Sequence, residues 1–274
     1  MAVIGIDLGT TNSLAGVWQD GKVVLIPNAF GEYLTPSVVG IGKNQEVFVG
    51  SVAKEMLATQ PYDTFREFKR NMGTNFLYGN GRKKYRAEEL SAFVLRRLKE
   101  DAEKFLGEEV TEAVISVPAY FDDNKRNATK NAGRLAGLKV ERLINEPSAV
   151  ALKHHTAEKG AESFIVFDFG GGTLDESLVE AFDNVVEIQA VAGDNYLGGK
   201  DFNEIIAQDF YEQNQISEAY LTKNEQENVL KEAEAVKKEL TDKNEAERQV
   251  YIKGEAYTLK MTNQRLIHLS AELF

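Results

Sequence analysis

One short pattern occurs twice in this chain and limits what the chain can fold into. The first copy is Ile4–Thr11 and the second is Val166–Thr173. Each copy reads as a buried apolar strand that ends in an aspartate, followed by a turn of glycine and threonine. Glycine lets backbone N–H groups approach phosphate oxygens where a Cβ would clash, and aspartate oxygens suit a hydrated divalent cation. The repeat predicts two similar halves that face each other and clamp a nucleotide polyphosphate.

Other phosphate-binding patterns fit the sequence poorly. No G-x-x-x-x-G-K-[ST] sequence occurs, which excludes a Walker loop. The glycines do not fall as G-x-G-x-x-G, so a Rossmann fingerprint is also a poor match. A single turn of this kind is often only a turn, and the interpretation therefore depends on its two copies.

Composition excludes several classes of protein. A net charge of −11 argues against binding to nucleic acid. No run approaches 18 apolar residues, so no membrane span is expected, and Asp7 interrupts the first apolar run, which reads as a strand and not as a signal peptide. The chain has no cysteine, which excludes disulfides and thiolate sites and fits a cytoplasmic location. His154, His155 and His268 lack metal-ligand spacing, so no metal site is expected there.

Alternating strand and helix patterns indicate an α/β fold. Apolar residues three and four positions apart predict a helix over Glu88–Leu106, and Asp122 or Asp123 caps the next helix. That helix connects two short apolar runs, which favours parallel pairing of two strands. Asp201 is expected to cap a helix, and Thr222 with Glu225 forms a capping box for another.

Five stretches of the chain resemble a known family. They are IGIDLGTTNS (4–13), FKRNMG (68–73), ISVPAYFDD (115–123), INEPSAVAL (144–152) and FDFGGGTLD (167–175). Together they resemble the ATPase domain of the heat-shock-protein-70 (DnaK-type) chaperones, over essentially the whole chain. The stretches NSLAGVWQDGKVVLIPNAFGEYLTPS and AGDNYLGGKDF are most similar to the HscC branch.

The resemblance implies a particular fold and domain arrangement. The fold is the actin-like ATPase fold, in which duplicated ribonuclease-H-like halves form two lobes around a nucleotide cleft. Lobe I is expected at residues 1–164, with an inserted subdomain at about 37–108. Lobe II is expected at residues 165–274, with an outer subdomain from about residue 202.

The resemblance also implies a set of site residues around ATP or ADP. Asp7 and Asp168 would hold Mg²⁺ largely through water, with K⁺ as a second candidate cation. Lys69 matches the essential lysine that places positive charge near the γ-phosphate, and Glu146 matches the glutamate that helps to place the attacking water. The phosphate-binding backbone would come from two turns: Gly9, Thr10, Thr11 and Asn12; and Gly170, Gly171, Gly172 and Thr173. Gly198 and Gly199 are further cofactor-binding positions.

Further positions match parts of the family that contact adenosine. Glu234, Lys237 and Thr241 fall on one face of the predicted helix and match adenosine-contacting positions. Lys238 matches a position that is often arginine, and lysine lacks the planar guanidinium that stacks on a base. Thr241 stands where serine is usual.

Three other residues are singled out by the comparison with the family pattern. Pro118 and Arg126 match positions that relay the nucleotide state between domains. Glu176 stands where the family usually has an aliphatic residue.

The resemblance also implies parts that the sequence does not contain. The amphipathic stretch from Thr262 to Phe274 has no stop signal, and the family's third motif, Gly-Gly-Ser/Thr-x-x-x-Pro, does not occur. We therefore expect the chain to stop before a domain boundary, without a peptide-binding domain. The implied partners are a J-domain co-chaperone, a nucleotide exchange factor, and client peptides bound by that absent domain.

Two other users of the same fold superfamily are the alternatives. An actin-type filament protein shares the paired phosphate loops, and a sugar kinase shares the fold. FKRNMG together with INEPSA favours the chaperone over the filament protein. A kinase needs a carboxylate base aimed at a substrate hydroxyl, whereas Lys69 and Glu146 fit the chaperone pattern.

Overall fold

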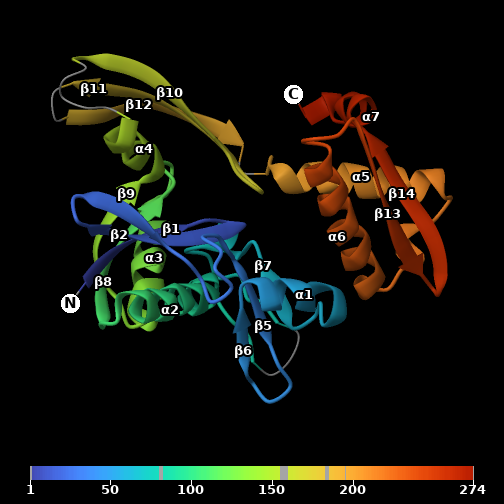
Figure 1. Cartoon of the computed structure of the whole chain (residues 1–274), viewed down its shortest axis with the longest axis horizontal. Helices are drawn as coiled ribbons and strands as arrows, with labels where there is room; N and C mark the ends of the chain where they lie inside the picture. The colour runs from blue at the N-terminus through green and yellow to red at the C-terminus, as the bar shows by residue number, and fades with distance from the viewer. Residues whose placement is uncertain (1, 80–82, 155–159, 183–184, 195, 274) are drawn as a thin grey trace.

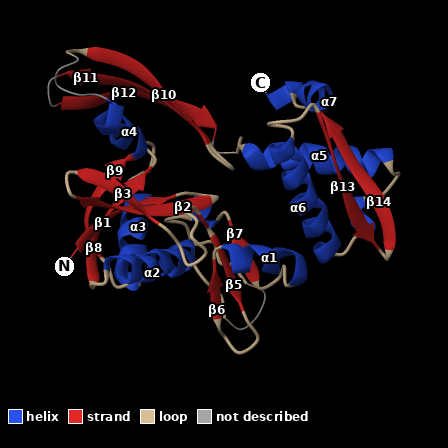
Figure 2. Ribbon diagram, viewed as in Figure 1, coloured by secondary structure: helices blue, strands red, loops and turns tan. Residues whose placement is uncertain are grey.

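The computed structural model describes residues 2–79, 83–154, 160–182, 185–194 and 196–273. Strands and helices alternate along the chain in a mixed α/β arrangement (Figure 1; Figure 2). The strands are β1 (Ala2–Leu8), β2 (Asn12–Gln19), β3 (Lys22–Ile26), β4 (Thr35–Pro36), β5 (Val38–Ile41), β6 (Val47–Val49), β7 (Thr64–Arg66), β8 (Val110–Val117), β9 (Lys139–Asn145), β10 (Glu162–Phe169), β11 (Leu174–Phe182), β12 (Val185–Asp194), β13 (Glu245–Ile252) and β14 (Glu255–Thr262). The α-helices are α1 (Ser51–Thr59), α2 (Ala87–Leu106), α3 (Asp123–Leu135), α4 (Glu146–His154), α5 (Gly199–Gln213), α6 (Lys223–Glu239) and α7 (Asn263–Leu269).

The N-terminal part is built on one sheet with the strand order β3-β2-β1-β8-β9, to which β4 adds through β2. β1, β8 and β9 are parallel, and α3 is the crossover between the last two. The predicted parallel pairing is therefore confirmed. The carboxyl ends of these three strands meet at one edge of the sheet, where open α/β sheets bind ligands.

Helices α2 and α3 pack on this sheet because their sequences have one apolar face. Leu90, Val94, Leu95 and Leu98 of α2 are buried in the same core as Ile4 and Ile115. Glu89 accepts a hydrogen bond from the backbone N–H of Arg86 at the start of α2, and Gly107 ends it with a φ of 71°. Asp122 caps α3 through the backbone N–H of Lys125, so the predicted cap is confirmed.

The second copy of the motif opens a separate sheet with the order β10-β11-β12. β10, β11 and β12 form an antiparallel meander, as β1, β2 and β3 do, and in both the repeated turn joins the first two strands. Asp7 pairs with Leu14 in the first, and Asp168 pairs with Asp175 in the second. The two turns therefore have the same length and leave their strands at equivalent points, as the repeat predicts.

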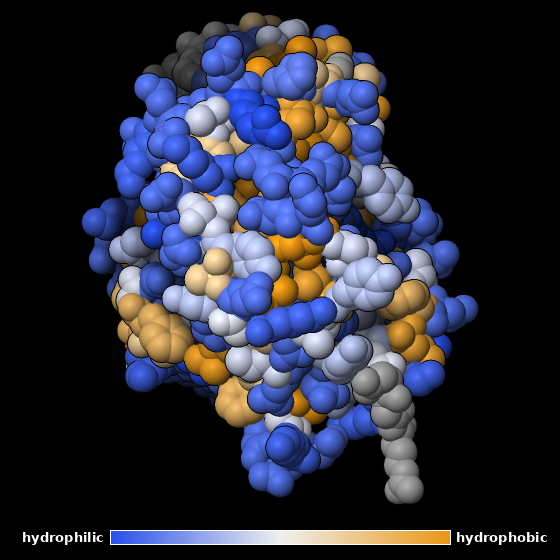
Figure 3. All heavy atoms as spheres, turned by 90° about the vertical axis from the view of Figure 1, so that its right-hand side faces the viewer, coloured by the Kyte–Doolittle hydropathy of each residue, from blue (hydrophilic) through white to orange (hydrophobic). Residues whose placement is uncertain are grey.

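The remaining elements form two smaller units. α1 packs on the three-stranded sheet β6-β5-β7, and α5, α6 and α7 pack with the hairpin β13–β14 around a second core. Figure 1 shows α1 next to α6, and the two helices are in contact. The face of the molecule that carries α5, α6 and the hairpin is largely hydrophilic, with scattered hydrophobic patches (Figure 3).

The structure corrects some sequence predictions. α5 begins at Gly199, with Gly198 at the N-cap, so Asp201 lies inside the first turn and not at the cap. Its carboxylate instead accepts a hydrogen bond from the backbone N–H of Gly198 at 2.7 Å. Gly198 and Gly199 therefore define the start of α5, and the carboxylate of Asp201 caps it from a position inside the first turn. The sequence did not predict α1 or α4, because the apolar pattern of each is short. Gly50 precedes the pattern of α1, and Glu146-Pro147 precedes that of α4.

Candidate functional site

The first turn is fixed by hydrogen bonds to the segment before β5. Ser37 donates its hydroxyl to the carbonyl of Gly9 at 2.7 Å, and its backbone N–H donates to the carbonyl of Thr11 at 2.8 Å. A Cβ at Gly9 would collide with the backbone carbonyl of Asn12. The chain therefore folds back on itself tightly here, which only glycine permits.

The second turn is fixed by the start of α5. The backbone N–H of Gly199 donates to the carbonyl of Gly170 at 3.0 Å, and that of Lys200 donates to the carbonyl of Gly171 at 2.9 Å. Lys237 of α6 donates its ammonium to the carbonyl of Gly199. A Cβ at Gly171 would collide with the hydroxyl of Thr11, so the two turns touch. The predicted face-to-face arrangement of the two copies is present.

Lys69 and Glu146 form a largely buried ion pair beside the turns. The Nζ of Lys69 lies 2.9 Å from Oε1 of Glu146, and their side chains are 9% and 17% exposed. Phe68 and Met72, both fully buried, anchor the 3-10 turn that carries Lys69. Glu146 is the first residue of α4, directly after β9. Burial raises the pKa of Glu146, Lys69 opposes this, and Asp7 and Asp168 raise it further.

Carboxylates gather at the same edge of the first sheet. Asp7, at the end of β1, accepts a hydrogen bond from Ser116 of β8 at 2.8 Å. Burial and the charge of Asp7 raise the pKa of Asp168. Burial raises the pKa of Asp175 to about 6, and the charges of Glu146 and Asp168 contribute to this. The negative charges of Asp168, Asp175 and Glu146 are therefore only partly offset by the positive charge of Lys69.

The acidic edge fits a magnesium ion. Mg²⁺ takes oxygen ligands, keeps several waters and commonly binds through one or two carboxylates together with substrate phosphates. Asp7 and Asp168 supply such carboxylates, and a divalent cation would offset the burial and the charge of Asp7, which together raise the pKa of Asp168. Among the described residues no group of three or more carboxylate or histidine side chains could hold a metal by itself.

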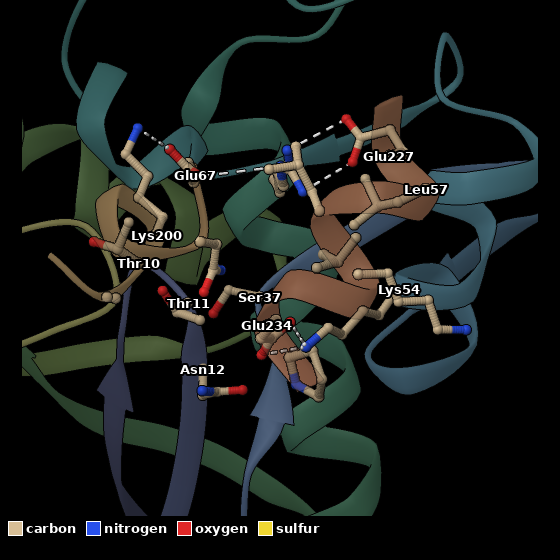
Figure 4. Close-up of a pocket in the computed structure, with 18 of the residues that line it drawn as sticks. Thr10, Thr11, Asn12, Ser37, Lys54, Leu57, Glu67, Lys200, Glu227 and Glu234 are labelled. Atoms are coloured by element: carbon tan, nitrogen blue, oxygen red, sulfur yellow. Dashed lines mark hydrogen bonds and ion pairs between the residues drawn. The ribbon is translucent and has the colours of Figure 1, made fainter. Parts of the chain in front are cut away.

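A large cavity opens on one side of the turns. Its volume is about 1030 Å³, which includes space that is open to solvent. It lies between the first turn, α1, the start of α5 and α6 (Figure 4). The predicted residues that line it are Thr10, Thr11, Asn12, Gly171, Gly199, Glu234 and Lys237.

Ion pairs bridge the cavity from α1 and β7 to α6. Lys54 of α1 lies 2.8 Å from Glu234, and Arg66 of β7 lies 3.0 Å from Glu227. Figure 4 shows the side chains of Lys54 and Glu234 pointing toward each other at this cavity. Hydrogen bonds from Lys54 and Lys238 outweigh the opposing effect of burial and lower the pKa of Glu234 to about 2. Residues far apart in the sequence therefore hold the two sides of the cavity together.

Other predicted residues lie around two further cavities or in the turns themselves. Lys69 and Thr173 line a second cavity, which also includes Thr10, while Glu146, Asp168 and Pro118 line a third one with Asp175. Gly170, Gly172 and Gly198 are not among the described residues that line these three cavities, and the backbone of Gly198 packs directly against that of Gly172.

Lys238 and Thr241 do not line the main cavity. Lys238 is 68% exposed and pairs with Glu234 along α6. Because α6 ends at Glu239, Thr241 lies beyond the helix. The contacts of these two residues with adenosine stay predictions.

The structure also places Arg126 and Glu176. Arg126 donates to the carbonyl of Phe121 at 2.8 Å and to the side chain of Asn145 at 2.7 Å, so it ties the turn after Pro118 to β9. Glu176 lies opposite Phe167 on the exposed face of β10 and β11. His155 lies outside the described residues.

Sequence reasoning did not assign a site role to Asp175, Arg70 or Lys54. Asp175 stands opposite Asp168 in the turn hairpin, but the repeat does not mark it, because the first copy has Leu14 at the equivalent position. Arg70 follows Lys69 and donates to the carbonyl of Gly172. Lys54 carries no local signal, because its partner Glu234 is 180 residues away.

Comparison with a family model agrees with this geometry. The model described as "Hsp70 protein" matches residues 3–80 and 77–274. The matched segments contain both glycine turns, Lys69 and Glu146. Among the described residues no helix is long and apolar enough to cross a membrane. Because the match extends over nearly the whole chain, the protein belongs to the Hsp70 family, and with it to the chaperone ATPases of actin-like fold.

Proposed function

We propose that this chain is the ATP-binding and ATP-hydrolysing domain of a DnaK-type chaperone, most similar to the HscC branch. The observation that carries the proposal is the buried Lys69–Glu146 pair beside two touching phosphate turns. Family membership favours this function over a filament protein or a sugar kinase. The proposal includes a cytoplasmic location, which fits a chain without cysteine.

The residues of the chain support phosphoryl transfer by position and charge. The backbone N–H groups of the two turns would bind the β- and γ-phosphates, with Thr10 and Thr173 beside them. Lys69 would stabilise the negative charge that is rearranged on the γ-phosphate, and Glu146 would orient the attacking water. Mg²⁺, held by Asp7 and Asp168 through water, would neutralise charge on the phosphates. K⁺ is a second candidate cation.

The main cavity would hold the rest of the nucleotide. Glu234 and Lys237 project into it from α6 and offer an acceptor and donors to ribose and base. Burial lowers the pKa of Lys237, and the charge of Glu234 opposes this shift. The ammonium of Lys237 donates a hydrogen bond to the carbonyl of Gly199, which holds the side chain in place. Lys238 and Thr241 belong to the same proposal, because they match adenosine-contacting positions of the family.

The domain arrangement is part of the same proposal. Lobe I would comprise residues 1–164 with an inserted subdomain at about 37–108, and lobe II residues 165–274 with an outer subdomain from about 202. Proteins of this family generally work with co-chaperones and client peptides. We propose a J-domain co-chaperone and a nucleotide exchange factor as partners, with client binding on a separate C-terminal domain.

Calorimetric titration with Mg·ATP and Mg·ADP, followed by a single-turnover hydrolysis assay, tests the function. We expect both nucleotides to bind with one site per chain and ATP to be hydrolysed without added sugar. A folded chain that binds neither nucleotide would contradict the proposal. Transfer of phosphate to a sugar faster than to water would favour the kinase, and sedimenting polymer formed with ATP would favour the filament protein.

A further inference from the structure

Glu67 joins the 3-10 turn that carries Lys69 to the start of α5. It is the N-cap residue of that turn, which spans Phe68–Asn71 and is called the Lys69 turn below. Its Oε2 lies 3.2 Å from Nζ of Lys200 in the first turn of α5, and Figure 4 shows the side chain of Lys200 pointing toward Glu67. The backbone N–H of Lys200 donates to the carbonyl of Gly171. One ion pair therefore connects the Lys69 turn, through α5, to the second glycine turn.

Arg70 makes another connection from the Lys69 turn. Its guanidinium donates to the carbonyl of Gly172, and its second terminal nitrogen lies 3.2 Å from Oε2 of Glu67. Arg70 and Lys200 are thus both 3.2 Å from the same carboxylate oxygen. Within the part of the chain that the structure describes, neither cation has an ion pair with another carboxylate. Loss of the Glu67 charge would leave two like charges close together, and their repulsion would separate the Lys69 turn from α5.

The backbone of Glu67 indicates that its side chain is what this position provides. Its φ of 57° and ψ of 19° lie in the left-handed region, which glycine adopts freely and glutamate adopts at a cost. The carbonyl of Glu67 accepts the backbone N–H of Arg70 at 3.1 Å, so this conformation begins the Lys69 turn. Glycine would form the same turn without the strain, but it would lose the carboxylate. Strained residues of this kind persist where surrounding contacts hold them, and they cluster at functional sites.

These contacts hold Lys69 from a second direction. The pair with Glu146, at 2.9 Å, ties Lys69 to the end of β9 in the first sheet. Glu67 and Arg70 flank Lys69 in the sequence and tie its turn to the second glycine turn instead. The position of Lys69 relative to that turn is therefore set by the charges on either side of it.

We propose that Glu67 is a positioning residue for ATP hydrolysis, which sets the distance between Lys69 and the second glycine turn by pairing with Lys200 and Arg70. This inference rests on the proposed ATPase function. Glu67 acts through Lys69 and not on the phosphates, because its own charge would repel them. Glu67 and Lys200 both line the main cavity, so their pairing also neutralises a negative charge that ATP would otherwise meet there.

Single-turnover hydrolysis and calorimetric titration of Glu67→Gln separate positioning from binding. Glutamine keeps the size of the side chain and removes its charge. We expect hydrolysis to slow by about tenfold, because a small displacement of a catalytic group costs up to about 100-fold in rate. Mg·ATP should bind at least as tightly as to the parent chain, since a negative charge is removed from the main cavity. Lys200→Gln should also slow hydrolysis, and the double variant should be no slower than Glu67→Gln.

Two control variants distinguish positioning from a structural role. Glu55→Gln breaks the pair of Glu55 with Lys231, which are 2.6 Å apart and join α1 to α6 without contact with the Lys69 turn. It should hydrolyse ATP within about twofold of the parent rate. Glu67→Gly relieves the left-handed backbone, so it should unfold at no lower temperature than Glu67→Gln and hydrolyse ATP as slowly. A Glu67→Gln chain that loses ATP affinity and hydrolysis in equal measure would show a structural role and overturn the proposal.

Amide hydrogen exchange tests the same connection without hydrolysis. We expect the backbone amides of Arg70 and Lys200 to exchange about fivefold faster in Glu67→Gln than in the parent chain, because their hydrogen bonds open more often. Unchanged exchange, hydrolysis at the parent rate, or additive effects of Glu67→Gln and Lys200→Gln would each overturn the proposal. A parent chain that hydrolyses no ATP would instead contradict the proposed function, and the exchange rates would still decide whether Glu67 holds the Lys69 turn.

Discussion

Lys69 and Glu146 are 77 positions apart in the sequence, and their side chains meet at 2.9 Å beside the two phosphate turns. Lys69 is carried by a short turn between two buried anchors, and Glu146 starts a helix at the carboxyl end of β9. The pair therefore brings a cation and a carboxylate to the place where two independent parts of the fold converge. A buried pair of this kind is costly to break, because the remaining charge has no partner.

Replacing Lys69 by alanine should abolish hydrolysis while leaving nucleotide binding largely intact. The lysine acts on charge that develops in the transition state, and loss of one such donor costs about 100-fold to 1000-fold in rate. Single-turnover hydrolysis and calorimetric titration measure the two effects separately. Lys43→Ala, at an exposed loop position, is the matched control. Hydrolysis by Lys69→Ala near the parent rate would show that its assigned role is wrong.

The Lys54–Glu234 pair should slow nucleotide release by holding α1 against α6. We expect Lys54→Ala to speed the release of fluorescent ADP by about fivefold, which corresponds to about 1 kcal/mol for a partly buried pair. A double-mutant cycle with Glu234→Ala isolates the pairwise interaction. Lys243→Ala removes an exposed lysine that pairs with Glu239 at the end of α6 and should have little effect. Additive effects of Lys54→Ala and Glu234→Ala would exclude the proposed clamp.

Asp175 should make the folded state less stable as the pH rises from about 4 to about 6. Its pKa in the folded chain is about 6, against an ordinary value of 3.8, so the folded state holds the proton more tightly than the unfolded state. The ionised carboxylate is therefore destabilising at neutral pH, and the penalty disappears in acid. Asp175→Asn should raise the free energy of unfolding at pH 7.5 by about 1 kcal/mol, after allowance for solvent screening.

Urea unfolding without nucleotide or magnesium, at pH 4 and pH 7.5, measures the effect of Asp175→Asn. The difference from the parent chain should vanish at pH 4. Glu176→Gln, on the other face of β11, is the control and should change stability little. An equal effect of Asp175→Asn at both pH values would show that the carboxylate does not carry the assigned repulsion.

Gly198 and Gly199 should differ sharply in their tolerance of alanine. A Cβ at Gly198 would lie 2.5 Å from the Cα of Gly172 and 2.6 Å from the carbonyl carbon of Gly171, so the second phosphate turn would have to move. At Gly199 the nearest atom is Nζ of Lys237 at 3.2 Å, the mobile end of a long side chain. We expect Gly198→Ala to cost about 1–3 kcal/mol of stability and to weaken ATP binding. Thermal unfolding and titration of both variants check this, and equal behaviour would contradict it.

The sequence by itself determined the local features of this protein. Strand, turn and glycine positions follow from short patterns, so the repeated motif predicted two equivalent turns, and caps such as Asp122 were found from neighbouring residues. The resemblance to a family gave roles to Lys69 and Glu146 that no local pattern provides. Where the signal was local but ambiguous, as at Asp201, the glycine turn and not the acid defined the helix start.

Only the tertiary structure decided which distant side chains meet. Lys54 with Glu234, Arg66 with Glu227, and Glu67 with Lys200 are contacts between separately folded elements. The raised pKa of Asp175 likewise depends on burial and on charges from other strands. Periodicity reports which face of a helix or strand is buried, but it does not report what that face packs against. The charge balance of the site is set by that packing.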